Sequence, residues 1–219
     1  MNSSWEITKQ RSTYHFDHFR IDPAVDTVTV LGNIEPFWKA ELDSIIKLTT
    51  PRTWRTRGQG TDRPDKEYDQ EEQDLERFGY GKDYVISDLT WQVPEMFNEI
   101  NLWFGMSNSR MRLHVQHPGQ VWNLHIDKLD KWHPEDPSQV MRVMIALTDW
   151  EPGHFWSYGN YVHRQWRAGD VTTFDWCNIP HATANAGHSP RVTLQITGVK
   201  TDATAIFLDK LKHTKEYNL

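Results

Sequence analysis

The sequence predicts a mainly β protein, in which closely spaced strands form a sandwich or barrel and a few helices support it. Between Arg110 and Val199, short runs rich in Val, Ile, Thr and aromatic residues follow one another, with Gly and Pro between many of them. Such spacing is typical of antiparallel sandwiches and barrels rather than of alternating strands and helices. The chain has 219 residues, which is enough to bury one sizeable core.

Composition narrows the class of protein. The chain is 37% hydrophobic with 11 Trp, which favours a packed core over disorder, and its net charge of -6 argues against a general nucleic-acid binder. Cys177 is the single cysteine, so no intrachain disulfide can form, which fits a reducing compartment. No signal-peptide pattern and no run of about 20 apolar residues is present. We therefore expect a soluble, intracellular (cytoplasmic) protein without a membrane partner; nothing in the sequence indicates its oligomeric state.

The N-terminal half contains helices between polar stretches. A strand is expected at 27–31, followed by a helix at 35–48 that Pro51 stops. A second helix is expected at 94–104, with Gly105 at its C-terminal end. Apolar residues on both helices predict that they pack against the outside of a sheet.

The segment 49–83 has a different character. It begins with several arginines, continues with an acidic run, and contains four glycines. One interpretation is a solvated loop with a short charged helix. The other is a lid or substrate-binding arm beside a site, because long loops without regular structure are often functional.

The remaining pattern is dominated by strands. They are expected at 111–116, 120–127, 140–150, 154–158, 170–176, 181–185 and 191–199, and a last helix at 203–212. We expect a single domain over 1–219: a supporting part at 1–106, a core at 107–200, and a C-terminal helix and tail at 201–219.

An H-x-D triplet lies within the run WNLHID at 122–127. His125 and Asp127 are two positions apart, so on a strand both point to the same face. They would supply two ligands of a facial metal site, and His181 is the best candidate for the third. Two histidines and one carboxylate leave positions open, which suits non-haem Fe(II) that binds a co-substrate and oxygen. Alone, the triplet is a weak signal, because such triplets occur by chance in strands that carry a surface His and Asp.

A cationic residue follows this candidate metal site at a fixed spacing. Arg191 comes ten residues after His181, inside an otherwise apolar strand, and Thr193 lies two further along on the same face. A buried Arg is costly without an anion, and its planar guanidinium matches a carboxylate. If the co-substrate is 2-oxoglutarate, Arg191 would bind its far carboxylate and the Thr193 hydroxyl would add a hydrogen bond.

These residues resemble the motif of the Fe(II)- and 2-oxoglutarate-dependent dioxygenases: H-x-D, a distal His, an Arg or Lys about ten residues later, and often Ser or Thr two after that. The run GQVWNLHID at 119–127 is similar to the G-Q-x-Y-x-x-H-x-D of prolyl-hydroxylase-like members, with Trp122 in place of the usual Tyr. AGDVTTF at 168–174 resembles the turn and strand before the distal His. The resemblance covers about 110–200.

The resemblance implies a double-stranded β-helix (jelly roll) over 107–200. It also implies that His125, Asp127 and His181 bind Fe(II), that Arg191 holds 2-oxoglutarate, and that O2 is consumed while substrate is hydroxylated and 2-oxoglutarate is decarboxylated to succinate. The resemblance further implies a substrate that is a small molecule or a peptide or protein side chain such as prolyl, and it leaves open a hydroxylation that ends in demethylation. The alternatives are a cupin-type metalloenzyme that does not use 2-oxoglutarate, and a non-catalytic binding protein on the same fold.

The sequence departs from the family at one position of this site. Gln116 stands where family members often have a Tyr that bonds 2-oxoglutarate, and Gln116 or His114 could substitute for it. Asn123 is expected on the face of His125, where it would contact the metal ligands or the co-substrate.

Two further groups allow more than one interpretation. Arg142 lies in a strand that is otherwise apolar, so it either binds co-substrate or substrate, or lies near the strand's end and reaches water or pairs with an acid such as Asp136. His154, Trp156 and Tyr158 alternate on another strand, where they form either an aromatic substrate wall or ordinary core packing.

Overall fold

The computed structural model describes residues 28–48, 88–90, 93–125, 127, 129, 132–159 and 161–212, without the side chains of 88–90, 123–125 and 212. The segment 49–83, expected as a charged loop or lid, lies outside the described residues. No helix in the described part of the chain is long and apolar enough to cross a membrane.

The described elements are mainly strands, joined by short helices. The strands are β1 (Thr29–Asn33), β2 (Asp88–Thr90), β3 (Ser107–Gln116), β4 (Val121–His125), β5 (Val140–Ala146), β6 (His154–Tyr158), β7 (Tyr161–His163), β8 (Asp170–Thr173), β9 (His181–Asn185) and β10 (Arg191–Val199). The α-helices are α2 (Leu42–Ile46), α4 (Asn98–Phe104) and α5 (Asp202–Lys212), and the 3-10 helices are η2 (Lys39–Glu41), η3 (Glu95–Phe97) and η5 (Pro137–Gln139).

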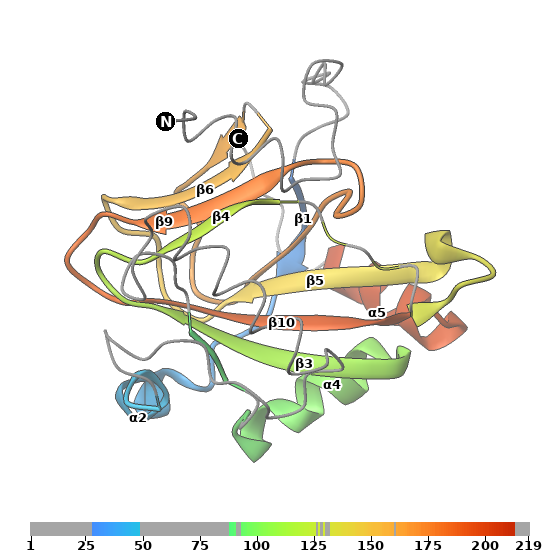
Figure 1. Cartoon of the computed structure of the whole chain (residues 1–219). Coiled ribbons are helices and arrows are strands. Elements are labelled where there is room, and N and C mark those ends of the chain that lie inside the picture. The colour runs from blue at the N-terminus through green and yellow to red at the C-terminus, as the bar shows by residue number, and fades with distance from the viewer. Residues whose placement is uncertain are drawn as a thin grey trace, which may run out of the picture.

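The strands form two antiparallel sheets. The larger sheet has the order β1-β8-β5-β10-β3-β2, and the smaller has the order β4-β9-β6-β7. Figure 1 shows the two sheets as separate layers. Successive strands from β3 to β10 alternate between the sheets, except for the β6–β7 hairpin within the smaller one. This eight-stranded arrangement is a double-stranded β-helix, or jelly roll, and confirms the predicted fold.

The helices cover the outer face of the larger sheet (Figure 1). Trp38, Ile100 and Phe104 are fully buried there, in one apolar cluster with Leu194 of β10. Each such side chain contributes about 2–3 kcal/mol relative to an exposed one. The indole Nε1 of Trp38 also donates to the backbone oxygen of Leu147 at 2.9 Å. The helices are thus attached to the sheet, as their apolar faces predict.

The two faces of strand β10 line two different buried regions, one under the helices and one between the sheets. Its outward side chains, Val192, Leu194 and Ile196, belong to the apolar cluster under the helices. Its inward side chains, which face the smaller sheet, are polar and buried: Arg191, Thr193, Gln195 and Thr197. Because side chains alternate along a strand, this polar row is a direct consequence of the sequence. This row supplies a cation and several hydrogen-bonding groups to the space between the sheets.

Between the sheets, aromatic residues form a second cluster. Its buried members are Leu129, Met144, Ala146, Trp156, Tyr158, Trp166, Phe174, Trp176 and Ile179. His154 of the same strand as Trp156 and Tyr158 is also buried. All three side chains are buried, as core packing predicts, and Trp156 and Tyr158 also lie close to Arg191, as described below.

Several element boundaries differ from the sequence prediction. The helix expected at 35–48 is shorter, with η2 followed by α2 and an end at Ile46. The helix expected at 94–104 is present as η3 and α4, and Gly105 ends it with φ 57°. A Cβ at Gly105 would lie 2.7 Å from Cβ of Ala203, so α5 also requires glycine there. The three-residue edge strand β7 was not predicted, because it is too short to show an alternating pattern.

Candidate functional site

Two neighbouring strands bring the predicted histidine ligands to the same place. In the antiparallel pair of β4 and β9, His125 is directly opposite His181. Residues opposite each other in such a pair occupy the same face of the sheet. Asp127 follows β4, and its backbone N–H donates to the carbonyl oxygen of Trp176 at 2.9 Å. The side chains of His125 and Asn123 lie outside the described part of the chain.

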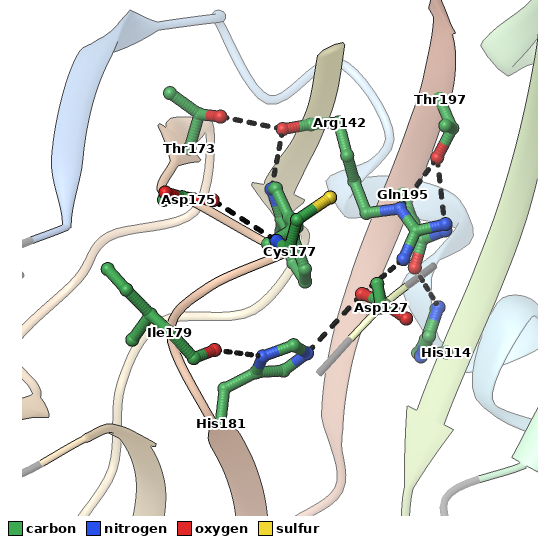
Figure 2. Close-up of polar contacts among 11 residues, drawn as sticks. His114, Asp127, Arg142, Thr173, Asp175, Cys177, Ile179, His181, Gln195 and Thr197 are labelled. Atoms are coloured by element: carbon green, nitrogen blue, oxygen red, sulfur yellow. Dashed lines mark hydrogen bonds and ion pairs between the residues drawn. The ribbon is translucent and has the colours of Figure 1, made fainter. Parts of the chain in front are cut away.

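The Asp127 carboxylate and the His181 imidazole face each other. Oδ2 of Asp127 lies 3.4 Å from Nε2 of His181 (Figure 2). The other ring nitrogen of His181, Nδ1, donates to the carbonyl oxygen of Ile179 at 3.0 Å. In the neutral imidazole this places the lone pair on Nε2, on the side of Asp127. The rings of Phe174 and Trp176 contact the buried imidazole edge-on, with centroid distances of 4.8 and 5.0 Å.

Arg142 of β5 forms an ion pair with Asp127. Its Nη1 contacts Oδ2 of Asp127, and its Nε donates to Oγ1 of Thr197 at 2.8 Å (Figure 2). The guanidinium carbon also lies 5.2 Å from the ring centroid of Trp176. The partner suggested by the sequence, Asp136, instead accepts hydrogen bonds from its own 3-10 helix. Arg142 is therefore a fixed, buried neighbour of a predicted metal ligand.

Arg191 is buried at another position between the sheets. Its guanidinium carbon lies 5.1 Å from the ring centroid of Trp156 and 6.0 Å from that of Trp166. Its Nε and Nη1 are buried and have no hydrogen-bond partner among the described residues. Burial lowers the pKa of Arg191 to about 10, so the side chain is still cationic at neutral pH. Arg191 is thus a buried cation, and two of its N–H groups have no protein acceptor among the described residues.

Tyr158 adds a third donor close to Arg191 and His181. It lies directly opposite His181 in the pairing of β6 with β9, and Arg191 is near enough to act on its pKa. Its hydroxyl is buried and has no hydrogen-bond partner in the described residues. Burial raises the pKa of Tyr158 well above its usual value, so the hydroxyl stays protonated. The sequence left Tyr158 as part of either an aromatic substrate wall or the core, and did not suggest it as a hydrogen-bond donor beside Arg191.

Thr193 follows Arg191 by two positions on β10, and Gln116 lies on the neighbouring strand β3. Gln116 is directly opposite Arg191 in the pairing of β3 with β10, and Thr193 is opposite His114. Nε2 of Gln116 donates to Oγ1 of Thr183 at 3.0 Å, while its Oε1 is buried without a partner in the described region. The position that holds a Tyr in the resembled family thus carries an amide that faces the smaller sheet.

His114 is kept neutral by its surroundings. Burial, and then the nearby charges of Arg112, Arg191 and Arg142, lower its pKa to about 3. Its Nε2 lies 3.1 Å from Oε1 of Gln195, to which it donates a hydrogen bond. Its ring therefore contributes hydrogen bonding but no charge to the site at neutral pH.

The structure brings part of the predicted metal site together. Asp127 and His181 are adjacent, whereas no cluster of three His, Cys, Asp or Glu side chains occurs within the described residues. The third predicted ligand, His125, is among the residues whose side chains are not described, and its backbone position is opposite His181. A carboxylate and an imidazole on one side, and a buried guanidinium on the other, are suited to hold a cation and a dianion next to each other.

No model of a known protein family matches the chain, and no characterised protein matches it in sequence. Among solved structures, the chain is similar to a viral collagen prolyl hydroxylase from Paramecium bursaria Chlorella virus 1, solved as its 2OG complex, with a TM-score of 0.39 and 14% identity over 63% of this chain and 92% of that one. It is also similar to a predicted oxalate decarboxylase from Thermotoga maritima (TM-score 0.33, 13% identity, 51% and 78% covered).

A third similar structure is a cupin 2 conserved barrel domain protein from Salinispora arenicola, with a TM-score of 0.32 and 15% identity over 56% of this chain and 82% of that one. At these values the similarity concerns the fold, which the strand order of the two sheets already establishes.

Proposed function

We propose that the protein is an Fe(II)- and 2-oxoglutarate-dependent oxygenase that hydroxylates its substrate. In this proposal His125, Asp127 and His181 hold Fe(II), and Arg191 binds the far carboxylate of 2-oxoglutarate. The observation that carries the proposal is Arg191 itself, a buried cation whose Nε and Nη1 have no acceptor among the described residues. Burying an uncompensated charge is costly, so such a residue is expected to have an anionic ligand.

The donor set around Asp127 supports Fe(II) as the metal. Two imidazoles and one carboxylate on one face are typical of non-haem iron sites with open positions for a co-substrate and oxygen. The hydrogen bond from Nδ1 of His181 to Ile179 directs Nε2 toward Asp127, as a metal-binding tautomer requires. Bound Fe(II) would supply the activation of O2 that couples oxidation of 2-oxoglutarate to oxidation of substrate.

The protein's own residues would orient and shield the co-substrate. Arg191 offers a planar pair of donors that matches a carboxylate, and the Tyr158 hydroxyl is a further buried donor beside it. Trp156 and Trp166 flank the guanidinium and exclude water from it, which strengthens its attraction for an anion. Arg142 would hold the Asp127 carboxylate in one orientation.

The test compares two 2-oxo acids of equal chain length. Fe(II)-loaded protein is titrated without oxygen with 2-oxoglutarate or with 2-oxopentanoate, which lacks the far carboxylate, and the weak visible band of the chelated metal is followed. Wild-type protein is expected to prefer 2-oxoglutarate by about a hundredfold, because a charge-assisted bidentate contact contributes about 3 kcal/mol. Arg191→Met should abolish this preference, whereas the matched exposed variant Arg164→Gln should keep it.

The outcomes separate the proposal from its alternatives. Wild-type protein that forms the band and releases succinate when oxygen is admitted supports the oxygenase. Metal binding without any preference between the two acids would instead favour a cupin-type metalloenzyme. Absence of metal binding in wild-type protein would favour a non-catalytic binding protein.

A further inference from the structure

Trp176 contacts three residues of the candidate metal site: Asp127, His181 and Arg142. It lies in the segment between β8 and β9 and is only 6% exposed. Its ring is edge-on to the imidazole of His181, with a centroid distance of 5.0 Å and an interplanar angle of 86°. The guanidinium carbon of Arg142 lies 5.2 Å from the ring centroid of Trp176. One buried side chain therefore borders both a predicted metal ligand and the cation that is paired with the other.

Three polar contacts connect Asp127, Trp176 and Arg142 in a closed ring. The backbone N–H of Asp127 donates to the carbonyl oxygen of Trp176 at 2.9 Å. Nε1 of Trp176 donates to the carbonyl oxygen of Arg142, also at 2.9 Å. Nη1 of Arg142 in turn contacts Oδ2 of Asp127. Because each residue donates to one neighbour and accepts from the other, none of them can shift without disturbing a contact.

The hydrogen bond from Nε1 sets the orientation of the Trp176 indole. Its acceptor belongs to β5, which lies between β8 and β10 in the larger sheet, so the sheet fixes the position of this carbonyl oxygen. The same oxygen also accepts a hydrogen bond from Oγ1 of Thr173 at 2.7 Å (Figure 2). A buried indole with a directional N–H bond has little rotational freedom. The ring is thus held beside Arg142 and His181.

Phe174 supports the same arrangement from a second direction. Its ring centroid lies 3.8 Å from that of Trp176 and 4.8 Å from that of His181. Both aromatic side chains belong to the buried cluster between the sheets. The imidazole of His181 is confined by these two rings and by the bond from its Nδ1 to Ile179. A side chain that is already confined loses little conformational entropy when it binds a ligand.

We propose that Trp176 is a positioning residue of the metal centre: its indole, oriented by the bond from Nε1 to the Arg142 carbonyl oxygen, holds the His181 imidazole and the Asp127 carboxylate in a metal-binding arrangement. The inference rests on the proposed function, because that function assigns Asp127 and His181 to a metal. Trp176 acts on His181 by direct packing and on Asp127 through its own carbonyl oxygen and through Arg142. Residues that orient metal ligands in this way raise metal affinity without binding the metal themselves.

The experiment measures metal affinity in the absence of co-substrate and substrate. Co(II), which takes the same nitrogen and oxygen ligands as Fe(II), is titrated into metal-free full-length protein by calorimetry, and its visible absorption bands report the coordination geometry. Trp176→Phe removes the N–H and part of the ring, and Trp176→Leu removes the aromatic ring altogether. We expect Trp176→Phe to bind Co(II) about tenfold more weakly than wild type, with altered bands, and Trp176→Leu to bind it more weakly still.

Two control variants remove comparable hydrogen bonds that do not orient the metal ligands. Trp38→Phe removes the N–H of another buried indole, which also donates to a backbone carbonyl oxygen at 2.9 Å but lies under the helices. Thr173→Val removes the other donor to the carbonyl oxygen of Arg142. Both should keep the Co(II) affinity and the absorption bands of wild type. Thermal unfolding of the metal-free proteins measures how far each variant, including those of Trp176, is destabilised.

The outcomes distinguish the role of Trp176 from the proposed function. A folded Trp176 variant that binds Co(II) as tightly as wild type, with the same bands, would overturn the inference. An equal loss of affinity in Trp38→Phe would also overturn it, because general destabilisation would then explain both results. If wild-type protein discriminates 2-oxoglutarate from 2-oxopentanoate in either case, the proposed function stands without Trp176. Wild-type protein that binds no Co(II) would contradict the metal assignment itself and the inference with it.

Discussion

Arg142 and Asp127 form an ion pair that connects the larger sheet to the segment following β4. They are fifteen positions apart in sequence, yet the guanidinium of Arg142 contacts the same carboxylate oxygen that faces His181. Only 20% of the Asp127 side chain and 8% of the Arg142 side chain are exposed. The pair holds the carboxylate in place and offsets its charge, so a cation bound there would share Oδ2 of Asp127 with Arg142.

Replacing Arg142 by Gln should destabilise the metal-free protein by about 2 kcal/mol, somewhat less than is typical of a fully buried pair because Asp127 is partly exposed. In a chain of this size that corresponds to a fall in Tm of about 4–8 °C. A divalent metal should restore more stability in Arg142→Gln than in wild type, because it neutralises the uncompensated carboxylate. Thermal unfolding with and without anaerobic Fe(II) measures both effects, with Arg164→Gln as the control. Equal metal-induced shifts in the two proteins would contradict the shared-oxygen model.

Replacing Arg191 by Met should leave the ligand-free protein as stable as wild type or more stable by about 1–2 kcal/mol. The substitution removes a buried charge whose Nε and Nη1 lack acceptors among the described residues, and the thioether packs well against Trp156 and Trp166. Urea unfolding without ligand measures the free energy, and Arg164→Met is the exposed counterpart. A loss of several kcal/mol in Arg191→Met would mean that the guanidinium already has a protein partner.

Tyr158→Phe should separate ligand binding from folding. The lost hydroxyl is buried and has no partner in the described part of the chain, so the free energy of unfolding should change by less than about 1 kcal/mol. If the hydroxyl donates to the co-substrate carboxylate, the Kd for 2-oxoglutarate should rise about tenfold, because a hydrogen bond to a charged group is worth about 1.5–3 kcal/mol. Anaerobic titration gives the Kd. Tyr161→Phe, which alters an exposed tyrosine of β7, is the matched control and should bind 2-oxoglutarate as wild type does.

Local alternation explains why much of the fold was predictable. In strand β10, Val192 and Leu194 lie on one face and Arg191 on the other. This alternation of apolar and polar residues is visible in the sequence. Strands β6, β9 and β10 accordingly have the predicted boundaries. Strand β5 ends at Ala146 instead of residue 150, because apolar residues continue past the point where the sheet pairing stops.

Contacts between sheets were not predictable in the same way. The sequence suggested Asp136 as a partner of Arg142, because a residue nearby in sequence is the natural choice without tertiary information. The observed partner, Asp127, instead follows β4 of the smaller sheet, whereas Arg142 belongs to the larger sheet. Tyr158 lies opposite His181 only because β6 and β9 pair, a register that no local pattern encodes. The metal ligands His125, Asp127 and His181 stay a prediction, supported by the contact of Asp127 with His181.

The buried, neutral His114 should make stability depend on pH. Its pKa is about 3 in the folded protein, lowered first by burial, against 6.5 for an ordinary histidine. Between these pH values the unfolded chain binds a proton at His114 and the folded protein does not. His114 therefore leaves the free energy of unfolding unchanged above pH 6.5 and lowers it progressively as the pH falls below 6.5. At pH 5 the loss is about 2 kcal/mol, at 1.36 kcal/mol for each pH unit below 6.5.

His114→Gln should reduce this acid sensitivity, because Gln does not titrate and its side-chain amide can still donate to Oε1 of Gln195. The measurement is urea unfolding of metal-free wild-type and variant proteins at pH 7.5 and pH 5. The variant should lose about 2 kcal/mol less than wild type between the two pH values. The same loss in both proteins would contradict this prediction, because it would mean that His114 binds its proton in the folded protein as readily as in the unfolded chain.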